Sequence, residues 1–325
     1  MRHDVGAGVI AILVSAAFAV GTPAAAVDYP ARPITLVVPY EAGGGNDVIA
    51  RLVAAKMSAA LGKPIVVENR GGAGSTIGTR FVAKAKPDGY TILIATSALA
   101  INPSLYPDAG YDPKKDFAPI GLIATSANLV LVRQTLPVHS MAELIVLAKR
   151  EPGKLNFGST GTGTSTHLAA ELFAAMAGVK ITAIPYKGVA PAVTDVLGEH
   201  VDLMFCPTAS VVGLVREQKL RALAVTGVKR SPLFPDLPTV AETGLSGYAA
   251  ELHYGIVAPA GTPPPVIDKL NAALNGALAD AGVQKRLGVD GAQILPGTPQ
   301  AYAADIAAEQ VKWSAILKQA GVTAK

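Results

Sequence analysis

Short apolar, β-branched runs alternate with amphipathic stretches along most of the chain. The run at 34–38 is followed by the glycine-rich loop 41–47 and then by apolar residues at helical spacing, which end at Gly62. Strands that alternate with helices predict parallel sheets covered by helices on both faces. The strands predicted in this way are 34–38, 65–67, 91–95, 155–157, 181–183, 203–205, 220–225 and 254–258.

The C-terminal quarter carries two further helical patterns. Prolines follow Thr262 directly, so we expect Thr262 to cap a helix whose first turn contains them. The last helix is expected over 299–320, with Tyr302, Ile306, Trp313 and Leu317 on one side. Trp313 is the only tryptophan, and we interpret it as an anchor that holds this helix to the core.

The N-terminus predicts export. Arg2 and His3 precede an apolar, small-residue stretch over 5–20, and three alanines at 24–26 form a cleavage signature. This order is typical of a secretory signal peptide over 1–26. The alternative is a membrane anchor, but the stretch is shorter than the about 20 residues that a spanning helix needs. We therefore expect a soluble mature chain in the periplasm.

Composition narrows the class of protein. The 325 residues are 50% hydrophobic and 16% charged, which excludes a disordered chain and favours two domains. The 28 basic and 24 acidic residues are scattered, so no nucleic-acid partner is expected. One cysteine, Cys206, excludes a disulfide framework, and its apolar neighbours indicate an inert core position.

Motifs of common enzyme classes are absent or broken. The sequence has no H-E-x-x-H pair, no G-x-S-x-G elbow and no phosphate-binding P-loop. We accordingly expect no catalytic residue, no cofactor and no metal. An exported α/β enzyme that acts on a carboxylate through His167 or Ser159 stays open as an alternative, as does a sensory receptor of the same fold.

Three glycine-rich loops carry the main functional signal. The loops 41–47, 70–76 and 158–164 each follow a predicted strand and open a predicted helix. This arrangement directs unpaired backbone N–H groups and the positive end of a helix dipole toward one spot, which suits an anion. The alternative is that the glycines only make tight turns. Three such loops in one exported chain favour the binding of an anionic ligand.

Several sequence runs occur in an order that resembles a known family. The chain is similar to the Bug-type extracytoplasmic solute receptors, the receptors of tripartite tricarboxylate transporters. The resemblance spans essentially the whole mature chain. The runs are VPYEAGGGNDVIAR at 38–51, ENRGGAG at 68–74 with IG at 77–78, PDGYT at 87–91, GSTGTGT at 158–164 with HLA at 167–169, PYKG at 185–188, LPTVAE at 237–242 and APAGTP at 258–263.

The resemblance implies an α/β, two-domain periplasmic-binding-protein fold (type II-like) with the ligand cleft between the domains. We place domain 1 at 27–127 and 253–325 and domain 2 at 128–252. The implied function is capture of a small organic carboxylate by domain closure and delivery to membrane permease subunits. A monomer is expected, and the ligand is a mono- or dicarboxylate, aromatic acids included.

The resemblance also implies which residues contact the ligand. They are Tyr40, Ala42, Gly43, Gly44 and Asp47 in the first loop, Thr96 and Ser97 after the third strand, and Ser159, Thr160, Gly161 and Thr164 in the loop at 158–164. His253 is a further candidate at the far end of the ligand. Glu41 departs from the family, where this position is small or proline, and puts a polycarboxylate such as citrate in doubt.

Two of these neighbourhoods also have a structural interpretation. Asp47 and Arg51 stand four residues apart, which suits an ion pair on one helix face. Asp47 would repel an anion, so we favour a role in holding its loop. His167 lies in the first turn of the helix after 158–164, where we favour a structural histidine.

Overall fold

The computed structural model describes residues 1, 3, 29–106, 108–289 and 291–320. The signal-peptide prediction rests mainly on 4–26, which lie outside this description. The strands are β1 (Ile34–Val38), β2 (Ile65–Asn69), β3 (Thr91–Thr96), β4 (Phe117–Val132), β5 (Asn156–Ser159), β6 (Thr182–Pro185), β7 (Leu203–Pro207), β8 (Arg221–Val225), β9 (Glu251–Pro259) and β10 (Ala292–Ile294). The helices are α1 (Gly45–Leu61), α2 (Thr76–Ala83), α3 (Ala98–Leu105), α4 (Met141–Arg150), α5 (Ser165–Ala177), α6 (Val189–Leu197), α7 (Val212–Arg216), α8 (Pro264–Leu278), α9 (Ala281–Val289) and α10 (Pro299–Ala320).

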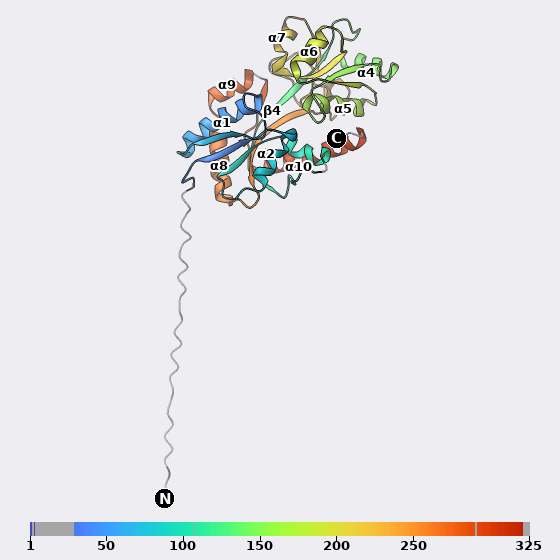
Figure 1. Cartoon of the computed structure of the whole chain (residues 1–325). Coiled ribbons are helices and arrows are strands. Elements are labelled where there is room, and N and C mark those ends of the chain that lie inside the picture. The colour runs from blue at the N-terminus through green and yellow to red at the C-terminus, as the bar shows by residue number, and fades with distance from the viewer. Residues whose placement is uncertain (2, 4–28, 107, 290, 321–325) are drawn as a thin grey trace.

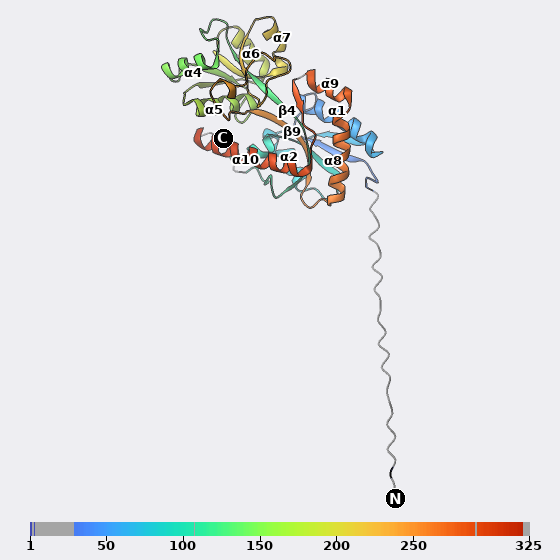
Figure 2. The same cartoon turned by 180° about the vertical axis from the view of Figure 1, so that it is seen from behind.

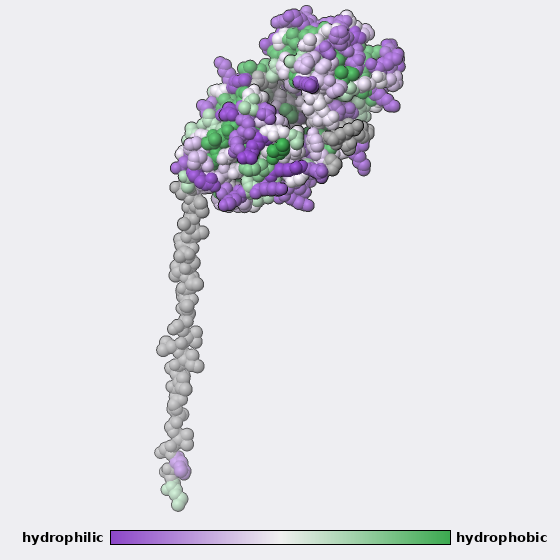
Figure 3. Space-filling model, in the orientation of Figure 1, coloured by the Kyte–Doolittle hydropathy of each residue, from purple (hydrophilic) through white to green (hydrophobic). Residues whose placement is uncertain are grey.

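The elements form two α/β lobes (Figure 1). One lobe contains α1, α2, α8 and α9, and the other contains α4 to α7. Strand order across the molecule is β2-β1-β3-β9-β4-β7-β5-β6, with β8 and β10 also paired to β4. Hydrophilic residues cover much of the outer surface of both lobes, and the surface is indented between them (Figure 3).

The long strand β4 joins the lobes. Its first part, Phe117 to Ala127, pairs with β9, and its last part, Asn128 to Val132, pairs with β7. Both pairings are antiparallel, as are those of β3 with β9 and of β4 with β8. The prediction of parallel sheets is therefore wrong for the centre of the molecule. The parallel pairs β1–β2, β1–β3, β5–β6 and β5–β7 lie on either side of this antiparallel centre.

Each lobe buries apolar side chains on both faces of its sheet. Successive residues of a strand point to opposite faces, and the cores follow this alternation. In β1, Leu36 joins one core cluster and Val37 another. In β4, Leu129 and Val130 likewise join different clusters of the second lobe. Helices therefore cover both faces, as the alternating pattern predicts.

Helix α10 packs against both lobes (Figure 2). Its first half places Tyr302 and Ile306 in the core of the first lobe. Its second half places Trp313, Ile316 and Leu317 in the core of the second lobe. Because α10 and β4 belong to both cores, the domain boundaries at 127/128 and 252/253 stay a prediction.

Local signals place several element ends where the sequence predicts them. Helix α1 ends at Gly62, which has φ +68°, and the Ser140 side chain caps α4 by accepting from the Glu143 N–H. The predicted cap Thr262 is wrong: Pro263 is the N-cap of α8. The Thr262 hydroxyl instead donates to the Pro259 carbonyl at 2.8 Å, because the chain turns there directly after β9. Cys206 is buried, and burial raises the pKa of its thiol to about 12.

Candidate functional site

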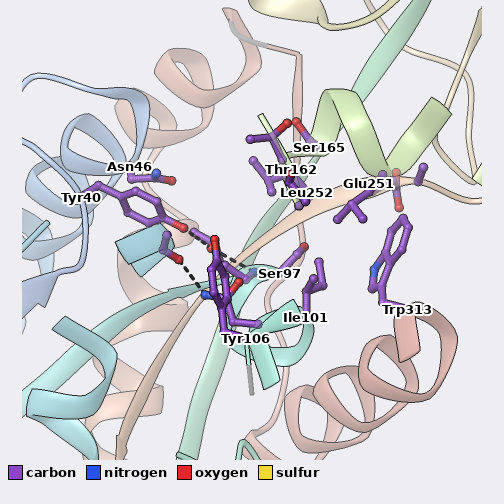
Figure 4. Close-up of a pocket in the computed structure, with 18 residues that line it drawn as sticks. Tyr40, Asn46, Ser97, Ile101, Tyr106, Thr162, Ser165, Glu251, Leu252 and Trp313 are labelled. Carbon is purple, nitrogen blue, oxygen red and sulfur yellow. Dashed lines mark hydrogen bonds between the residues drawn. The ribbon is translucent and has the colours of Figure 1, made fainter. Parts of the chain in front are cut away.

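A cavity of about 220 Å³ lies between the lobes, and residues of both lobes point into it (Figure 4). Loops and helix ends supply most of its polar wall. Side chains of α3, α5 and α10 supply most of its apolar wall. The lining residues are Tyr40, Asn46, Gly74, Thr96, Ser97, Ala98, Ile101, Asn102, Tyr106, Thr162, Gly163, Thr164, Ser165, Leu168, Ala250, Glu251, Leu252 and Trp313.

Three helices begin at this cavity. Asn46 lies in the first turn of α1, and Ala98 and Ser165 are the first residues of α3 and α5. Their N-cap residues, Gly44, Ser97 and Thr164, make no side-chain capping hydrogen bond, although the Ala98 N–H of α3 donates to Thr96 Oγ1 at 3.3 Å. The first N–H groups of a helix have no intrahelical partner and carry the positive end of its dipole. Among the described lining residues there is no lysine, arginine or histidine. The wall therefore suits a carboxylate bound by neutral donors.

Tyr40 and Thr96 form the polar floor of the cavity. The Tyr40 hydroxyl and Thr96 Oγ1 are 2.7 Å apart. Burial raises the pKa of Tyr40, so its phenol stays neutral and can donate a hydrogen bond. Beside them, Ser97 Oγ accepts from the His253 N–H at 2.9 Å, which ties α3 to β9. The Asn102 amide donates to the Gly74 carbonyl at 2.6 Å and holds the loop before α2.

A network of hydroxyl groups shapes the loop before α5. The Thr160 N–H donates to Thr166 Oγ1 at 3.0 Å, and the Thr164 hydroxyl donates to the Gly161 carbonyl at 2.7 Å. The Gly163 N–H donates to His167 Nδ1 at 3.4 Å. Burial lowers the pKa of His167, which suits a neutral acceptor at this nitrogen. These bonds hold Gly163 and Thr164 at the cavity.

Asp47 organises the loop before α1. Its Oδ2 accepts from the Gly43 N–H at 2.9 Å and from Arg51 Nε at 3.0 Å, and its Oδ1 accepts from the Asn69 amide at 3.0 Å. The ion pair expected between Asp47 and Arg51 is thus present in the structure. The Arg51 hydrogen bond, with those from Gly43 and Asn69, outweighs burial and lowers the pKa of Asp47 to about 2.

This lowered pKa predicts an acid-sensitive contribution to stability. An unfolded aspartate titrates near about 3.9, so the Asp47 contribution is complete above that pH and is lost as the pH falls toward the folded value. We expect Asp47→Asn to lower the free energy of unfolding at neutral pH by about 1–3 kcal/mol. The difference from the wild-type protein should shrink between about pH 5 and 2. Urea denaturation at several pH values measures it, and a difference independent of pH would contradict the assignment.

The structure brings four of the predicted site residues to the cavity wall and leaves eight outside it. Tyr40, Thr96, Ser97 and Thr164 line the cavity. The eight others are Ala42, Gly43, Gly44, Asp47, Ser159, Thr160, Gly161 and His253, and for them direct ligand contact stays a prediction.

The reasons differ among these eight. The first three are exposed at the surface of the loop before α1. Ser159 is buried, and its Oγ accepts from the Gly161 N–H at 3.3 Å. His253 Nδ1 lies 2.9 Å from Asp305 Oδ2, so its ring faces α10 instead of the cavity.

The enzyme alternative lacks a nucleophile–base pair at the cavity. Neither Ser159 nor His167 lines it, and no hydrogen bond joins the two in the described structure. His167 Nε2 instead lies 3.6 Å from Glu171 Oε1. Within the described ranges, no cluster of three or more His, Cys, Asp or Glu could hold a metal ion. None of the described helices has the length and apolar character that crossing a membrane requires.

Sequence reasoning missed the wall opposite Tyr40 and Asn46. Its residues are Tyr106 directly after α3, Glu251 and Leu252 on β9 and Trp313 on α10, which all line the cavity. Trp313 is buried as the sequence predicts, but it also forms part of this wall, and its Nε1–H donates to Glu309 Oε2 at 2.7 Å. The one available signal was Glu251, an acidic residue two positions before His253 and just ahead of the strand predicted over 254–258.

Comparison with known proteins agrees with this geometry. The family model described as "Tripartite tricarboxylate transporter family receptor" matches residues 49–322. The solved structure of the periplasmic binding protein BugD is 41% identical, with a TM-score of 0.75, over 91% of this chain and 100% of that one. An R. palustris protein solved with adipate is 38% identical, with a TM-score of 0.77, over 92% and 100%. MatC from Rhodopseudomonas palustris, solved with bound malate, is 33% identical, with a TM-score of 0.73, over 89% and 100%. The expected periplasmic-binding-protein fold is confirmed.

Proposed function

Because the chain belongs to the tripartite tricarboxylate transporter receptor family, we propose that it captures a small organic carboxylate in the periplasm and delivers it to membrane permease subunits. The family is one of solute-binding receptors and not of enzymes. Capture proceeds by closure of the two lobes over the ligand, with no cofactor or metal. The signal peptide directs export and is cleaved, and the receptor acts as a monomer.

The observation that carries this proposal is that three helix N-termini meet at a cavity whose described lining residues include no lysine or arginine. Backbone N–H groups at the starts of α1, α3 and α5 are the donors for a carboxylate, apart from the Ala98 N–H of α3, which already donates to Thr96 Oγ1 at 3.3 Å. Each hydrogen bond to a charged group contributes about 1.5–3 kcal/mol. Three or four of them, reduced by the costs of association, reach the range of a micromolar complex, about −8 kcal/mol.

Carboxylate ligands of similar proteins support the substrate class. The structures with adipate and malate hold dicarboxylates. Apolar contact is also available here, since Ile101, Leu168 and Trp313 line the same cavity as the helix ends. The ligand that suits this wall combines one carboxylate with a short carbon skeleton.

A screen of carboxylic acids tests the proposal. A ligand at about 100 times its Kd should stabilise the protein by about 2.7 kcal/mol, which thermal unfolding detects. Since Trp313 is the only tryptophan and lines the cavity, the same ligand should change the intrinsic tryptophan fluorescence. Lobe closure should also lower the radius of gyration in small-angle scattering. Scattering curves that superimpose with and without a saturating ligand would count against closure.

A further inference from the structure

Glu251 is an acidic side chain in the wall of a cavity that suits an anion. Among the described lining residues it is the only Asp, Glu, Lys, Arg or His. It is the first residue of β9, lies opposite Ala127 of β4 and is 9% exposed. Figure 4 places it beside Trp313, across the cavity from Tyr40 and Asn46. A ligand whose carboxylate reaches the starts of α1 and α5 therefore directs its other end toward an acid.

The cations near Glu251 are each paired with another carboxylate. Lys312 Nζ on α10 binds Glu309 Oε1 and also donates to the Ala249 carbonyl at 3.3 Å. His253 Nδ1 on β9 lies 2.9 Å from Asp305 on α10. The other oxygen of Glu309 accepts from the Trp313 indole. Among the described residues that act on this end of the cavity, three carboxylates, Glu251 included, thus share one lysine and one histidine.

Glu251 has one backbone donor in the second lobe. Its carboxylate accepts from the Val228 N–H, and its Oε1 lies so close to Gly227 that a Cβ there would be 2.7 Å away. Burial raises the pKa of Glu251, and Glu309 adds to this, while His253, Val228 and Lys312 lower it without cancelling the effect. The buried carboxylate is thus incompletely compensated by the protein, and an unpaired buried charge is costly.

We propose that Glu251 determines the specificity of this cavity, and that the ligand is a carboxylate that also carries an ammonium group, which pairs with Glu251. This inference rests on the proposed function. The carboxylate of such a ligand meets the helix N-termini, the carbon skeleton lies along Ile101, Tyr106 and Leu168, and the ammonium group reaches Glu251. A second ionised carboxylate in that place meets a like charge in a poorly solvated site.

Calorimetry with carbon-matched acids tests the inference on the wild-type protein. The six-carbon set is hexanoate, adipate, 6-aminohexanoate and norleucine, and the four-carbon set is butyrate, succinate, 4-aminobutyrate and 2-aminobutyrate. We expect an amino acid of one set to bind at least about tenfold more tightly than the mono- and dicarboxylate of that set. The place of the ammonium group in the best ligand then reports the distance to Glu251.

The variant Glu251→Gln separates the effect of the negative charge of Glu251 from the effect of its side-chain size and hydrogen bonding. The amide keeps the size of the side chain and an oxygen that accepts from the Val228 N–H, but it removes the negative charge. The favoured amino acid should lose about ten- to a hundredfold in affinity, while the matched monocarboxylate changes by less than about threefold. Glu251→Asp keeps the charge and should preserve the order of affinities. Glu217→Gln is the matched control, because Glu217 is exposed, pairs with Lys219 at 2.8 Å and lies outside the cavity wall.

The outcomes distinguish this inference from the proposed function. If mono- or dicarboxylates bind as tightly as their amino counterparts, Glu251 has only a structural role and the inference is overturned while the function stands. The inference is overturned in the same way if Glu251→Gln leaves the preference unchanged. If the folded wild-type protein binds none of the acids in this panel or in the wider screen, the function fails together with the inference. Should Glu251→Gln not fold, the wild-type ranking decides alone.

Discussion

Replacing Gly163 with valine is expected to lower ligand affinity at least about a hundredfold while the protein stays folded. Gly163 lines the cavity with φ +79°, a backbone conformation that β-branched residues rarely adopt. A Cβ at this position would collide with Leu105 Cδ1. Because Leu105 is 1% exposed and packed in the core, its side chain has little room to turn away, and we expect the loop before α5 to move away from α3. That movement separates two of the three helix N-termini that converge on the ligand, and a misplacement of about 1 Å at such a site is costly. Calorimetry with the best acid from the screen measures the loss.

Gly178→Val is the matched control. Gly178 follows the C-terminal end of α5 with φ +63°, and a Cβ there would meet no atom within 4 Å. Both substitutions place valine in the left-handed region at an end of the same helix, which costs about 1–3 kcal/mol of stability. Only Gly163→Val adds a collision with Leu105 of α3. Equal affinities of the two variants for the best acid would show that the loop does not contribute to binding.

Replacing Trp313 with alanine is expected to lower the free energy of unfolding by about 3–5 kcal/mol, the range for large aromatic side chains removed from a core. Trp313 is 2% exposed and packs, with Ile316 and Leu317, into the core of the second lobe. Its indole N–H donates to Glu309, whose buried carboxylate loses that donor in the variant. The second half of α10 should therefore loosen from the second lobe. Urea denaturation followed by circular dichroism measures the change.

Two further variants of α10 serve as comparisons for Trp313→Ala. Val311 is 67% exposed on the same helix, so Val311→Ala should change stability by less than about 0.5 kcal/mol. Trp313→Phe keeps an aromatic ring in the core but removes the donor to Glu309, and we expect it to lie between wild type and Trp313→Ala. If Trp313→Ala is as stable as Val311→Ala, the indole is not part of the core that holds α10.

Much of the local structure is readable from the sequence because it depends on neighbours in the chain. The β-branched run at 34–38 coincides with β1, and the pattern that ends at Gly62 coincides with α1. The last helix occupies the predicted residues 299–320. Each glycine-rich loop was expected to open a helix, and the loops before α1 and α5 do so at the cavity. The resemblance to the receptor family, carried by runs along the chain, indicated the fold that the structure has.

Long-range pairing was not readable in this way. The 16-residue strand β4 is not among the predicted strands, and its antiparallel partners β7, β8 and β9 lie far along the chain. Periodicity states which face of an element is apolar, but not which strand lies beside it. For this reason the alternation of strands and helices predicted parallel sheets and missed their antiparallel centre.

The cavity wall likewise has one side that could be predicted from the sequence and one side that could not. The sequence by itself determined the polar side, since its resemblance to the receptor family pointed to Tyr40, Thr96, Ser97 and Thr164, and these four line the cavity. Only the tertiary structure decided the opposite wall. Glu251 and Trp313 stand 62 positions apart, and β9 and α10 bring them to one cavity. In the sequence, an apolar or acidic residue looks the same whether its side chain faces the core or a ligand cavity. Which of the two it faces depends on how elements distant in the chain pack together.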